Sequence, residues 1–348
     1  MKKPVKIILI VVSAILTVVF ATAGLGLYVF GDKINAANSV EKIGDKLYYM
    51  EYEGDYGFQG FLDEGGAASE EEMAKYIVFM MSGGFVKLDT EETEMNFGCS
   101  TLSVKGEGVS LMGRNYDWQG DEGNAMIIHT KPEDGYESYS TTWLDFLGFG
   151  KGFAPEEFKD KYMAIAAVYV PLDGINEKGL CVADLIAGDN EVTRQTTEKP
   201  DLTTTSAIRL LLDRAANVDE ALKLLEEYDM NSSIGMAHHL SISDKEGNSV
   251  VVEYVKGEMI VTETDVVTNH YLAQGEKFGV GNEESHRRFE KIKDLKNSIN
   301  SREAMAGCME SVSYEGETQW SIVYDKENLT MEFYNRRDFE IPLSFDFE

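Results

Sequence analysis

The chain of 348 residues carries 61 acidic and 32 basic residues, which gives a formal net charge of −29. A charge of this sign excludes nucleic acid as a partner, because a phosphate polymer would be repelled. The length allows one large domain or two small ones, and a hydrophobic content of 43% is enough for a sizeable core.

The first predicted element is a membrane segment. Lys2, Lys3 and Lys6 precede an uncharged stretch at residues 7–30, and roughly twenty apolar residues suffice to span a bilayer as a helix. A signal-peptidase site is present at residues 21–23, but the apolar stretch continues beyond it. We therefore expect residues 1–30 to be an uncleaved single-pass anchor, with the rest of the chain outside the cell. A cleaved signal peptide is the alternative.

Residues 31–98 contain no recognisable chemistry and are interpreted as a pro-segment. Within them, Ser69 and Glu72 form a capping box that predicts a helix as far as Gly83. This pattern is typical of a small folded unit rather than a linker.

From Cys99 onward the pattern changes to short strands, then two helices, then strands again. This order predicts an α+β layered domain over residues 99–348 rather than a doubly wound parallel sheet. The predicted helices are residues 205–216, a second one that starts at Asn217 with Glu220 as its capping partner, and two more capped by Ser285 and Ser301. The predicted strands are residues 101–104, 109–114, 125–130, 163–170, 180–185, 240–243, 249–254, 259–262, 266–268, 319–324 and 330–334.

The cysteines and histidines limit the chemistry that is open to the chain. The three cysteines are Cys99, Cys181 and Cys308. If Cys99 is reactive, the other two are either a disulfide or two buried thiols, and the apolar surroundings of Cys181 favour thiols. The five histidines show no metal-binding spacing. We therefore expect no metal and no organic cofactor.

The pair Gly98–Cys99 stands at the start of the first predicted strand. An N-terminal cysteine would combine a thiol nucleophile with an α-amine of pKa about 8 that can accept the thiol proton. That amine exists only after the preceding peptide bond is cut. Glycine before the cysteine suits a self-cleavage step, because it can expose its carbonyl group to the thiol.

Two charged residues follow at the end of the second predicted strand. Pairing of the two strands would bring Arg114 and Asp117 beside Cys99. Arg114 would favour the thiolate, and Asp117 would hold and orient the α-ammonium group. A structural ion pair between Arg114 and Asp117 is the equally weighted alternative.

These motifs together resemble the choloylglycine hydrolase family of N-terminal nucleophile hydrolases. That group includes bile salt hydrolases and penicillin V acylases, with acid ceramidase and N-acylethanolamine amidase as relatives. The resemblance covers about residues 99–340. It is carried by Cys-Ser-Thr at 99–101, Gly-Arg-Asn-Tyr-Asp-Trp at 113–118, Asn-Glu-Lys-Gly-Leu at 176–180, a strand–turn–strand segment at 240–253, Thr-Asn at 268–269 and Arg-Arg-Phe at 287–289.

The resemblance implies a four-layer αββα sandwich, with two antiparallel sheets between helix layers. It implies Cys99 as nucleophile and base, with Arg114 and Asp117 in the roles just described. Asn176 and Asn269 would contribute to an oxyanion hole, and each is also a good turn residue. Arg288 would be the late arginine of the site, with Arg287 as the neighbouring alternative.

The predicted activity is hydrolysis of carbon–nitrogen bonds other than peptide bonds in linear amides. The substrate would be a small N-acyl amide, with Tyr116, Trp118 and Trp143 as pocket walls or core residues. The short spacing from Asn269 to Arg288 makes bile-salt specificity doubtful. The alternatives are an acyltransferase, a non-catalytic surface binding module and a Cys–His–Asn protease; whether the pro-segment stays bound and whether the chain forms a homo-oligomer are left open.

Overall fold

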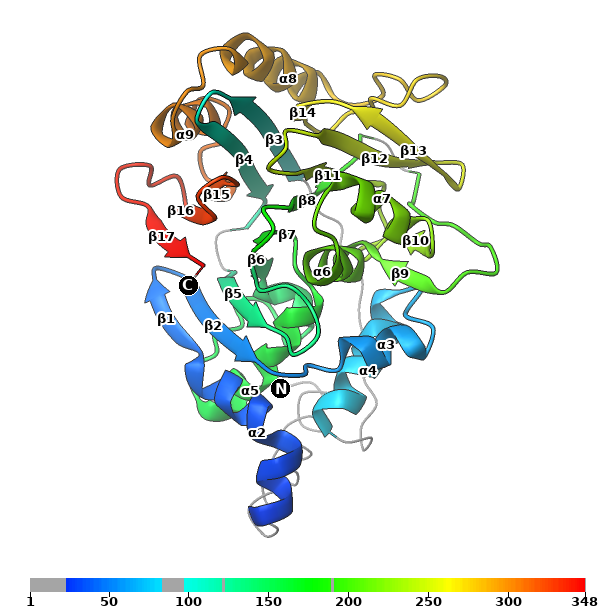
Figure 1. Ribbon diagram of the computed structural model, residues 1–348, viewed down its shortest axis with the longest axis vertical. Coiled ribbons are helices and arrows are strands. Elements are labelled where there is room, and N and C mark those ends of the chain that lie inside the picture. Colours follow the sequence, from blue (N-terminus) through cyan, green and yellow to red (C-terminus); the bar gives the residue numbers. More distant parts are fainter. Residues whose placement is uncertain (1–22, 83–96, 121–122, 189–190, 348) are drawn as a thin grey trace.

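The computed structural model describes residues 23–82, 97–120, 123–188 and 191–347. Within these ranges two large β-sheets pack face to face, and helices cover both outer faces (Figure 1). Side chains of both inner faces form a shared core that includes Trp320, Ile127 and Val251. The layer order is therefore helix, sheet, sheet, helix, as the family resemblance implies.

The smaller sheet carries the predicted hairpin at its centre. Its strand order is β14-β3-β4-β15-β16-β17, and every neighbouring pair is antiparallel. The strands are β3 (Phe97–Gly106), β4 (Val109–Trp118), β14 (Val266–Val267), β15 (Thr318–Asp325), β16 (Thr330–Asn335) and β17 (Leu343–Asp346).

The larger sheet has the order β1-β2-β5-β6-β7-β8-β11-β12-β13. It is mixed rather than purely antiparallel, because β2 runs parallel to β5. The strands β9 (Asp201–Thr203) and β10 (Asp229–Asn231) form a separate parallel pair. The strands of the large sheet are β1 (Glu41–Gly44), β2 (Leu47–Glu53), β5 (Ala125–Lys131), β6 (Ser138–Trp143), β7 (Asp173–Asn176), β8 (Cys181–Ile186), β11 (His238–Ser243), β12 (Ser249–Val255) and β13 (Glu258–Glu263).

The helices divide between the two outer faces. Helices α8 (Glu283–Lys296) and α9 (Arg302–Ser311) pack on the smaller sheet through residues such as Ile292 and Met305. The other helices share a core with the larger sheet. They are α2 (Ala23–Ser39), α3 (Phe58–Asp63), α4 (Glu70–Ser82), α5 (Phe158–Ala164), α6 (Thr204–Arg214) and α7 (Val218–Leu225).

Most predicted helix starts are confirmed by their caps. Asn217 accepts a hydrogen bond from the backbone N–H of Glu220, and Ser301 caps α9 in the same way. The cap of α8 is Asn282 rather than the predicted Ser285, whose own N–H donates to Asn282. The predicted strand at 163–170 is also wrong: this apolar stretch forms the end of α5 and a 3-10 helix, Ile165–Tyr169, and packs its apolar side chains against the helical core.

The described part of the predicted pro-segment belongs to this same layered domain. Strand β2 is paired with β5 along its whole length, and α2 packs in the core beneath through Ala36 and Ala37. Residues 83–96, which include the predicted helix end at Gly83, lie outside the described residues. The boundary of the pro-segment at residue 98 therefore stays a prediction.

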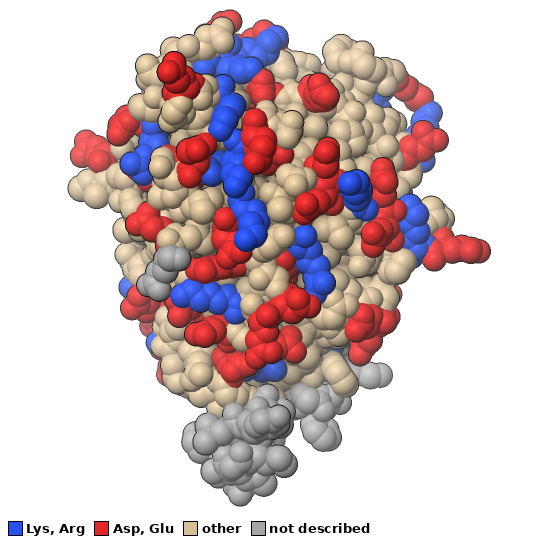
Figure 2. All heavy atoms as spheres, in the orientation of Figure 1, with Lys and Arg blue, Asp and Glu red and all other residues tan. Residues whose placement is uncertain are grey.

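The predicted membrane segment falls mainly on residues that the structure does not describe. Residues 7–22 lie outside the described ranges, and the last part of the segment begins α2. Among the described helices, none is long and apolar enough to cross a bilayer. Figure 2 shows acidic side chains interleaved with basic ones over one face, so the charge of −29 is not gathered into a single patch there.

Candidate active site

The β3–β4 hairpin decides which groups meet at Cys99. Cys99 is paired with Tyr116, and Gly98 is paired with Asp117. Because successive residues of a strand point to opposite faces, Cys99, Arg114 and Tyr116 share the face toward the larger sheet, and Asp117 shares the face toward α8 with Gly98. The structure thus brings Arg114 and Asp117 to Cys99 from opposite sides of one sheet.

The thiol of Cys99 is buried beside a buried guanidinium group. Burial raises the pKa of the Cys99 thiol, and the charge and hydrogen bond of Arg114 partly oppose this effect. Arg114 is held by three further contacts, to Asp173 Oδ2 at 3.2 Å, the carbonyl of Asp184 at 2.7 Å and the carbonyl of Asn115 at 3.0 Å. A fixed cation next to the sulfur favours the thiolate form.

Asp117 lies in a second buried ion pair, on the helix side of the sheet. Its Oδ2 atom is 3.2 Å from Arg288 Nη1, and its Oδ1 atom accepts a hydrogen bond of 2.6 Å from the Thr318 hydroxyl. Burial raises the pKa of Asp117 to about 6, even though both partners favour the carboxylate. Arg288 is buried, whereas Arg287 is exposed and paired with Glu284, so Arg288 is the arginine of this site.

Asn269 follows β14 in the chain. Because β14 pairs with β3 in antiparallel register, Asn269 lies beside Cys99. The Oδ1 atom of Asn269 accepts from the backbone N–H of Cys99 and from Arg288, both at 2.7 Å. Its amide group donates to the carbonyl of Ile186 at 2.8 Å. Because Oδ1 has two donors as neighbours and the amide nitrogen has an acceptor, the side chain is placed to hold the Cys99 nitrogen. A contribution of Asn269 to an oxyanion hole, through its backbone N–H or its side-chain amide, stays a prediction.

Space around Gly98 is tight. A Cβ atom at this position would lie 3.1 Å from Tyr314 Cε2, 3.2 Å from Asp117 Oδ2 and 3.3 Å from Arg288 Nη2. A larger residue would displace these groups. Glycine therefore lets the buried ion pair approach the bond that precedes Cys99.

The structure does not bring Asn176 to this cluster. Its amide group donates to the carbonyls of Leu212 and Ala215 at the end of α6, and its Oδ1 atom accepts from two N–H groups of the following turn. The predicted oxyanion role of Asn176 is therefore not supported by its contacts. Strand β7, which ends at Asn176, pairs with β8. Asp184 and Ile186, near the far end of β8, line the same pocket as Cys99.

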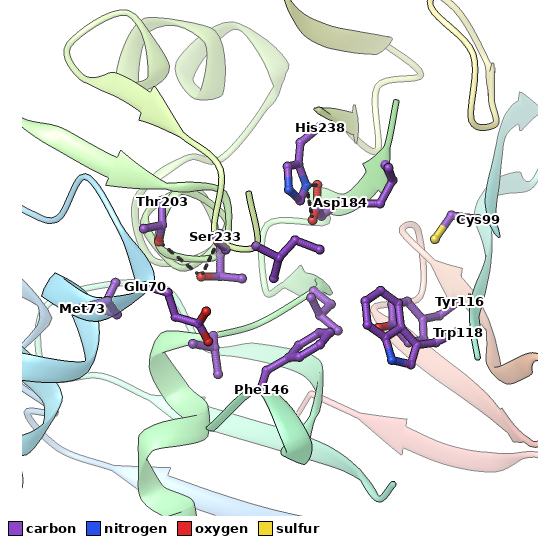
Figure 3. Close-up of a pocket in the computed structure, with 15 residues that line it drawn as sticks. Glu70, Met73, Cys99, Tyr116, Trp118, Phe146, Asp184, Thr203, Ser233 and His238 are labelled. Carbon is purple, nitrogen blue, oxygen red and sulfur yellow. Dashed lines mark hydrogen bonds and ion pairs between the residues drawn. The ribbon is translucent and has the colours of Figure 1, made fainter. Parts of the chain in front are cut away.

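A pocket with about 600 Å³ of empty space, part of it open to solvent, adjoins Cys99 (Figure 3). Tyr116 and Trp118 line it, and both also belong to the core between the sheets, so each fits both of the predicted alternatives. Trp143 is not among the lining residues; it is buried in the core between the sheets, 6.3 Å from the ring of Trp320. Trp143 is thus a core residue, the second of the two predicted alternatives.

Sequence reasoning missed several residues of the site. Asp184 and His238 line the pocket and are joined by a contact of 2.9 Å, and Asp173 anchors Arg114. Asp184 is the one charged residue in strand β8. A charged residue within a buried apolar strand indicates a functional position, so this residue could have been found from the sequence. Glu70, Met73 and Phe146 also line the pocket, but no local pattern marks them.

The three cysteines are free and buried, so the favoured interpretation of Cys181 and Cys308 as thiols is confirmed. Cys181 lies within the core between the sheets, and Cys308 lies between α9 and the smaller sheet. Burial raises the pKa of Cys181 to about 12 and that of Cys308 to about 11. Of the three thiols, only Cys99 opens on the pocket and has an arginine against its sulfur.

Two structures with a similar fold are variants of the conjugated bile acid hydrolase from Clostridium perfringens. They cover 71% of this chain and 92% of theirs, with TM-scores of 0.52 and 0.51 and sequence identities of 16% and 17%. Penicillin V acylase from Pectobacterium atrosepticum is 31% identical over 164 residues, which are 43% of this chain and 42% of that protein. The chain thus matches less than half the length of this curated relative.

The fold that these structures share is the layered α+β fold of N-terminal nucleophile hydrolases. Residues 104–334, about two thirds of the chain, match the family described as acyl-coenzyme A:6-aminopenicillanic acid acyl-transferase. The chain belongs to this family, which confirms the resemblance seen in the sequence.

Proposed function

We propose that the protein is a self-processing cysteine amidohydrolase that cleaves a linear carboxamide bond of an N-acyl substrate, with Cys99 as nucleophile. One observation carries the proposal. The peptide bond between Gly98 and Cys99 is surrounded by Asp117, Asn269 and Arg288, while Arg114 and a pocket flank the thiol. Buried charges gathered at one cysteine are a feature of catalytic rather than structural sites.

In the proposed maturation step, the Cys99 sulfur attacks the carbonyl carbon of Gly98. The C–N bond breaks, the Cys99 nitrogen takes up a proton, and a thioester joins Gly98 to the sulfur. Water then hydrolyses the thioester. The product is a free α-amine on Cys99, which Asn269 Oδ1 holds because it already accepts from this nitrogen at 2.7 Å.

The mature site repeats the same chemistry on a substrate. The α-amine takes the thiol proton, the sulfur attacks the substrate carbonyl, and the amine of the substrate leaves with that proton. Water releases the acyl group from the thioester. Asp117 serves as the group that orients the α-ammonium, since its Oδ2 atom lies beside Gly98, which the cut removes.

The two pieces are expected to stay together after the cut. Strand β2 is hydrogen-bonded to β5 along its length, and helices α2, α3 and α4 pack into the common core. Glu70 and Met73 of the first piece also line the pocket. The anchor at residues 7–30, with the domain outside the cell, remains part of the proposal because the described residues do not include most of it.

The proposal is tested by intact mass and N-terminal sequencing of the purified chain beside a Cys99→Ala variant. We expect a new N-terminus at Cys99 that is absent from the variant, and hydrolysis of acyl anilides by the cut protein only. Cys181→Ala is the matched control and should be processed normally, because its thiol is buried in the core. A folded wild-type chain that remains uncut and inactive would contradict the proposal.

An acyltransferase is the second candidate, because the matching family is named for an acyl transfer reaction. Both reactions pass through the same thioester, and they differ in whether water or an amine accepts the acyl group. Adding increasing concentrations of a primary amine to the anilide assay separates them. A hydrolase keeps releasing the free acid, whereas a transferase converts most of the acyl group to the new amide.

The pH dependence of anilide hydrolysis should report the ionisation of Asp117. Its pKa is raised to about 6, so the carboxylate is lost, and the rate falls, as the pH drops through this value. The Thr318 hydroxyl lowers this pKa by donating to Oδ1. Thr318→Val should therefore move the acid limb of the rate profile to higher pH. An unmoved limb, or one at lower pH, would show that Asp117 does not control it.

A further inference from the structure

The ionisable side chains that line the pocket are mostly acidic. Its ionisable residues are Glu70, Asp184 and His238, together with Cys99 and Tyr116, and its described lining contains no lysine or arginine. An acyl chain that ends in a carboxylate would need a cation or free N–H donors to meet it in the pocket.

The cations near the pocket are already engaged. Arg114 contacts Asp173 and two backbone carbonyls, and Arg288 contacts Asp117, Asn269 and the carbonyl of Cys99. Both side chains are buried. Neither guanidinium group lines the pocket, so a substrate anion inside it would meet neither of them.

His238 is not placed to receive an anion either. Its Nδ1 atom contacts both carboxylate oxygens of Asp184 at 2.9 Å, and its Nε2 atom contacts the hydroxyl of Ser232 at 2.9 Å. Both ring nitrogens are thus occupied by groups of the protein. The carboxylate of Asp184 retains lone pairs and lines the pocket, so the pair offers acceptors rather than donors.

The far side of the pocket is also rich in acceptors. In Figure 3, Glu70 lies on the side opposite Cys99, with Phe146 and Trp118 between them. The hydroxyls of Thr203, Thr205 and Ser233 line the same region and bond to one another at 3.2–3.3 Å. Glu70 is exposed and has no hydrogen bond or ion pair with other described residues, so its carboxylate is accessible to a ligand.

A buried group without a partner also indicates that a ligand belongs here. The hydroxyl of Tyr116 is buried and makes no hydrogen bond, although its residue lines the pocket and is paired with Cys99 across the hairpin. A buried hydroxyl left without a partner costs free energy. A polar atom of a bound substrate, close to the thiol, would satisfy it.

We propose that the pocket selects N-acyl substrates whose acyl chain is apolar next to the scissile amide and ends in an ammonium group, with Glu70 as the residue that determines this specificity. Chains that end in a carboxylate are discriminated against. This inference rests on the proposed function, because it assumes that the acyl chain extends from Cys99 into the pocket.

The test uses three anilides of matched chain length: an ω-aminoalkanoyl, a plain alkanoyl and an ω-carboxyalkanoyl anilide. At about pH 8 the carboxyl of Glu70, whose pKa partial burial raises to about 7, is mostly ionised. We expect the wild-type kcat/KM for the ammonium substrate to exceed that for the carboxylate substrate at least about tenfold, since like charges in a pocket repel strongly. Glu70→Lys should reverse this order.

Glu71→Lys is the matched control. It makes the same charge change on the next residue of α4, whose side chain is 57% exposed, pairs with Lys75 and does not line the pocket. It should leave the order of the three substrates unchanged. Equal rates for the ammonium and carboxylate substrates in the wild type, or the same effect of both substitutions, would overturn the inference.

Binding of the same three anilides to the Cys99→Ala variant, followed by tryptophan fluorescence, separates the two proposals. Trp118 lines the pocket and serves as the reporter. If no anilide is cleaved by the wild type but the ammonium ligand still binds best, the amidohydrolase proposal fails and the charge preference holds. If cleavage occurs and the three ligands bind equally, the charge preference fails and the amidohydrolase proposal holds.

Discussion

Replacement of Arg288 by leucine should slow self-cleavage at Gly98–Cys99 at least about 100-fold, because precise placement of reacting groups contributes on this scale. One guanidinium group holds three elements of the site. Nη1 donates to the carbonyl of Cys99 at 3.0 Å and to Asp117 at 3.2 Å, and Nη2 donates to Asn269 at 2.7 Å. Without this guanidinium group, the Cys99 carbonyl loses a hydrogen bond, and so does the Asn269 side chain that accepts from the Cys99 nitrogen. The cut is followed by gel shift and intact mass over time.

The adjacent residue supplies an internal control for this prediction. Arg287 lies on the same helix but is exposed, and its partner is Glu284. Arg287→Leu should be processed at the wild-type rate. Arg288→Lys tests whether charge alone is enough; because an ammonium group lacks the two-pronged geometry, we expect slow processing here too. Normal processing of a folded Arg288→Leu chain would show that Arg288 has no role in the cleavage.

Replacement of Asp173 by alanine should destabilise the fold by about 3–5 kcal/mol, the range for removing one partner of a buried ion pair. Asp173 and Arg114 are both fully buried, and their contact is 3.2 Å. The same carboxylate accepts hydrogen bonds from Trp320 at 3.1 Å, Tyr324 at 3.0 Å and Thr141. The change therefore leaves the buried cation of Arg114 without its counter-ion and removes the acceptor of several buried donors.

This loss is measured by urea unfolding in the Cys99→Ala background, so that every chain is uncut. The control is Glu327→Ala, which breaks a surface pair with Lys105 whose side chains are 56% and 39% exposed. Exposed pairs contribute at most about 1 kcal/mol. If both variants unfold at similar urea concentrations, Arg114 does not depend on Asp173, and its position beside Cys99 must have another cause.

The main parts of the fold and the centre of the site could be predicted from local patterns. The hairpin that carries Cys99, Arg114 and Asp117 follows from two alternating runs and a glycine-containing turn. Helices α7 and α9 follow from their capping residues, Asn217 and Ser301. These features depend on residues that are close together in the sequence, and local chemistry fixes them.

The failures are residues whose local pattern fits two environments. By its local pattern Asn176 could be a turn residue or a contributor to the oxyanion hole, and only the packing of α6 beside it shows that its amide group contacts the end of that helix. The apolar stretch 163–170 is equally compatible with a strand or a helix by its composition. In the folded protein this stretch packs against the other helices and is itself helical.

By itself, the sequence determined the residues of the proposed reactive centre: a cysteine after a glycine, with Arg114 and Asp117 three residues apart on the next strand. Only the tertiary structure decided which side of the sheet each charge occupies, that Arg288 rather than Arg287 reaches the site, and that Glu70 and Asp184 share a pocket with Cys99. The reason is physical. Strand pairing and helix caps depend on near neighbours, whereas the partners of a buried charge come from elements far apart in the chain and are selected only when the layers pack.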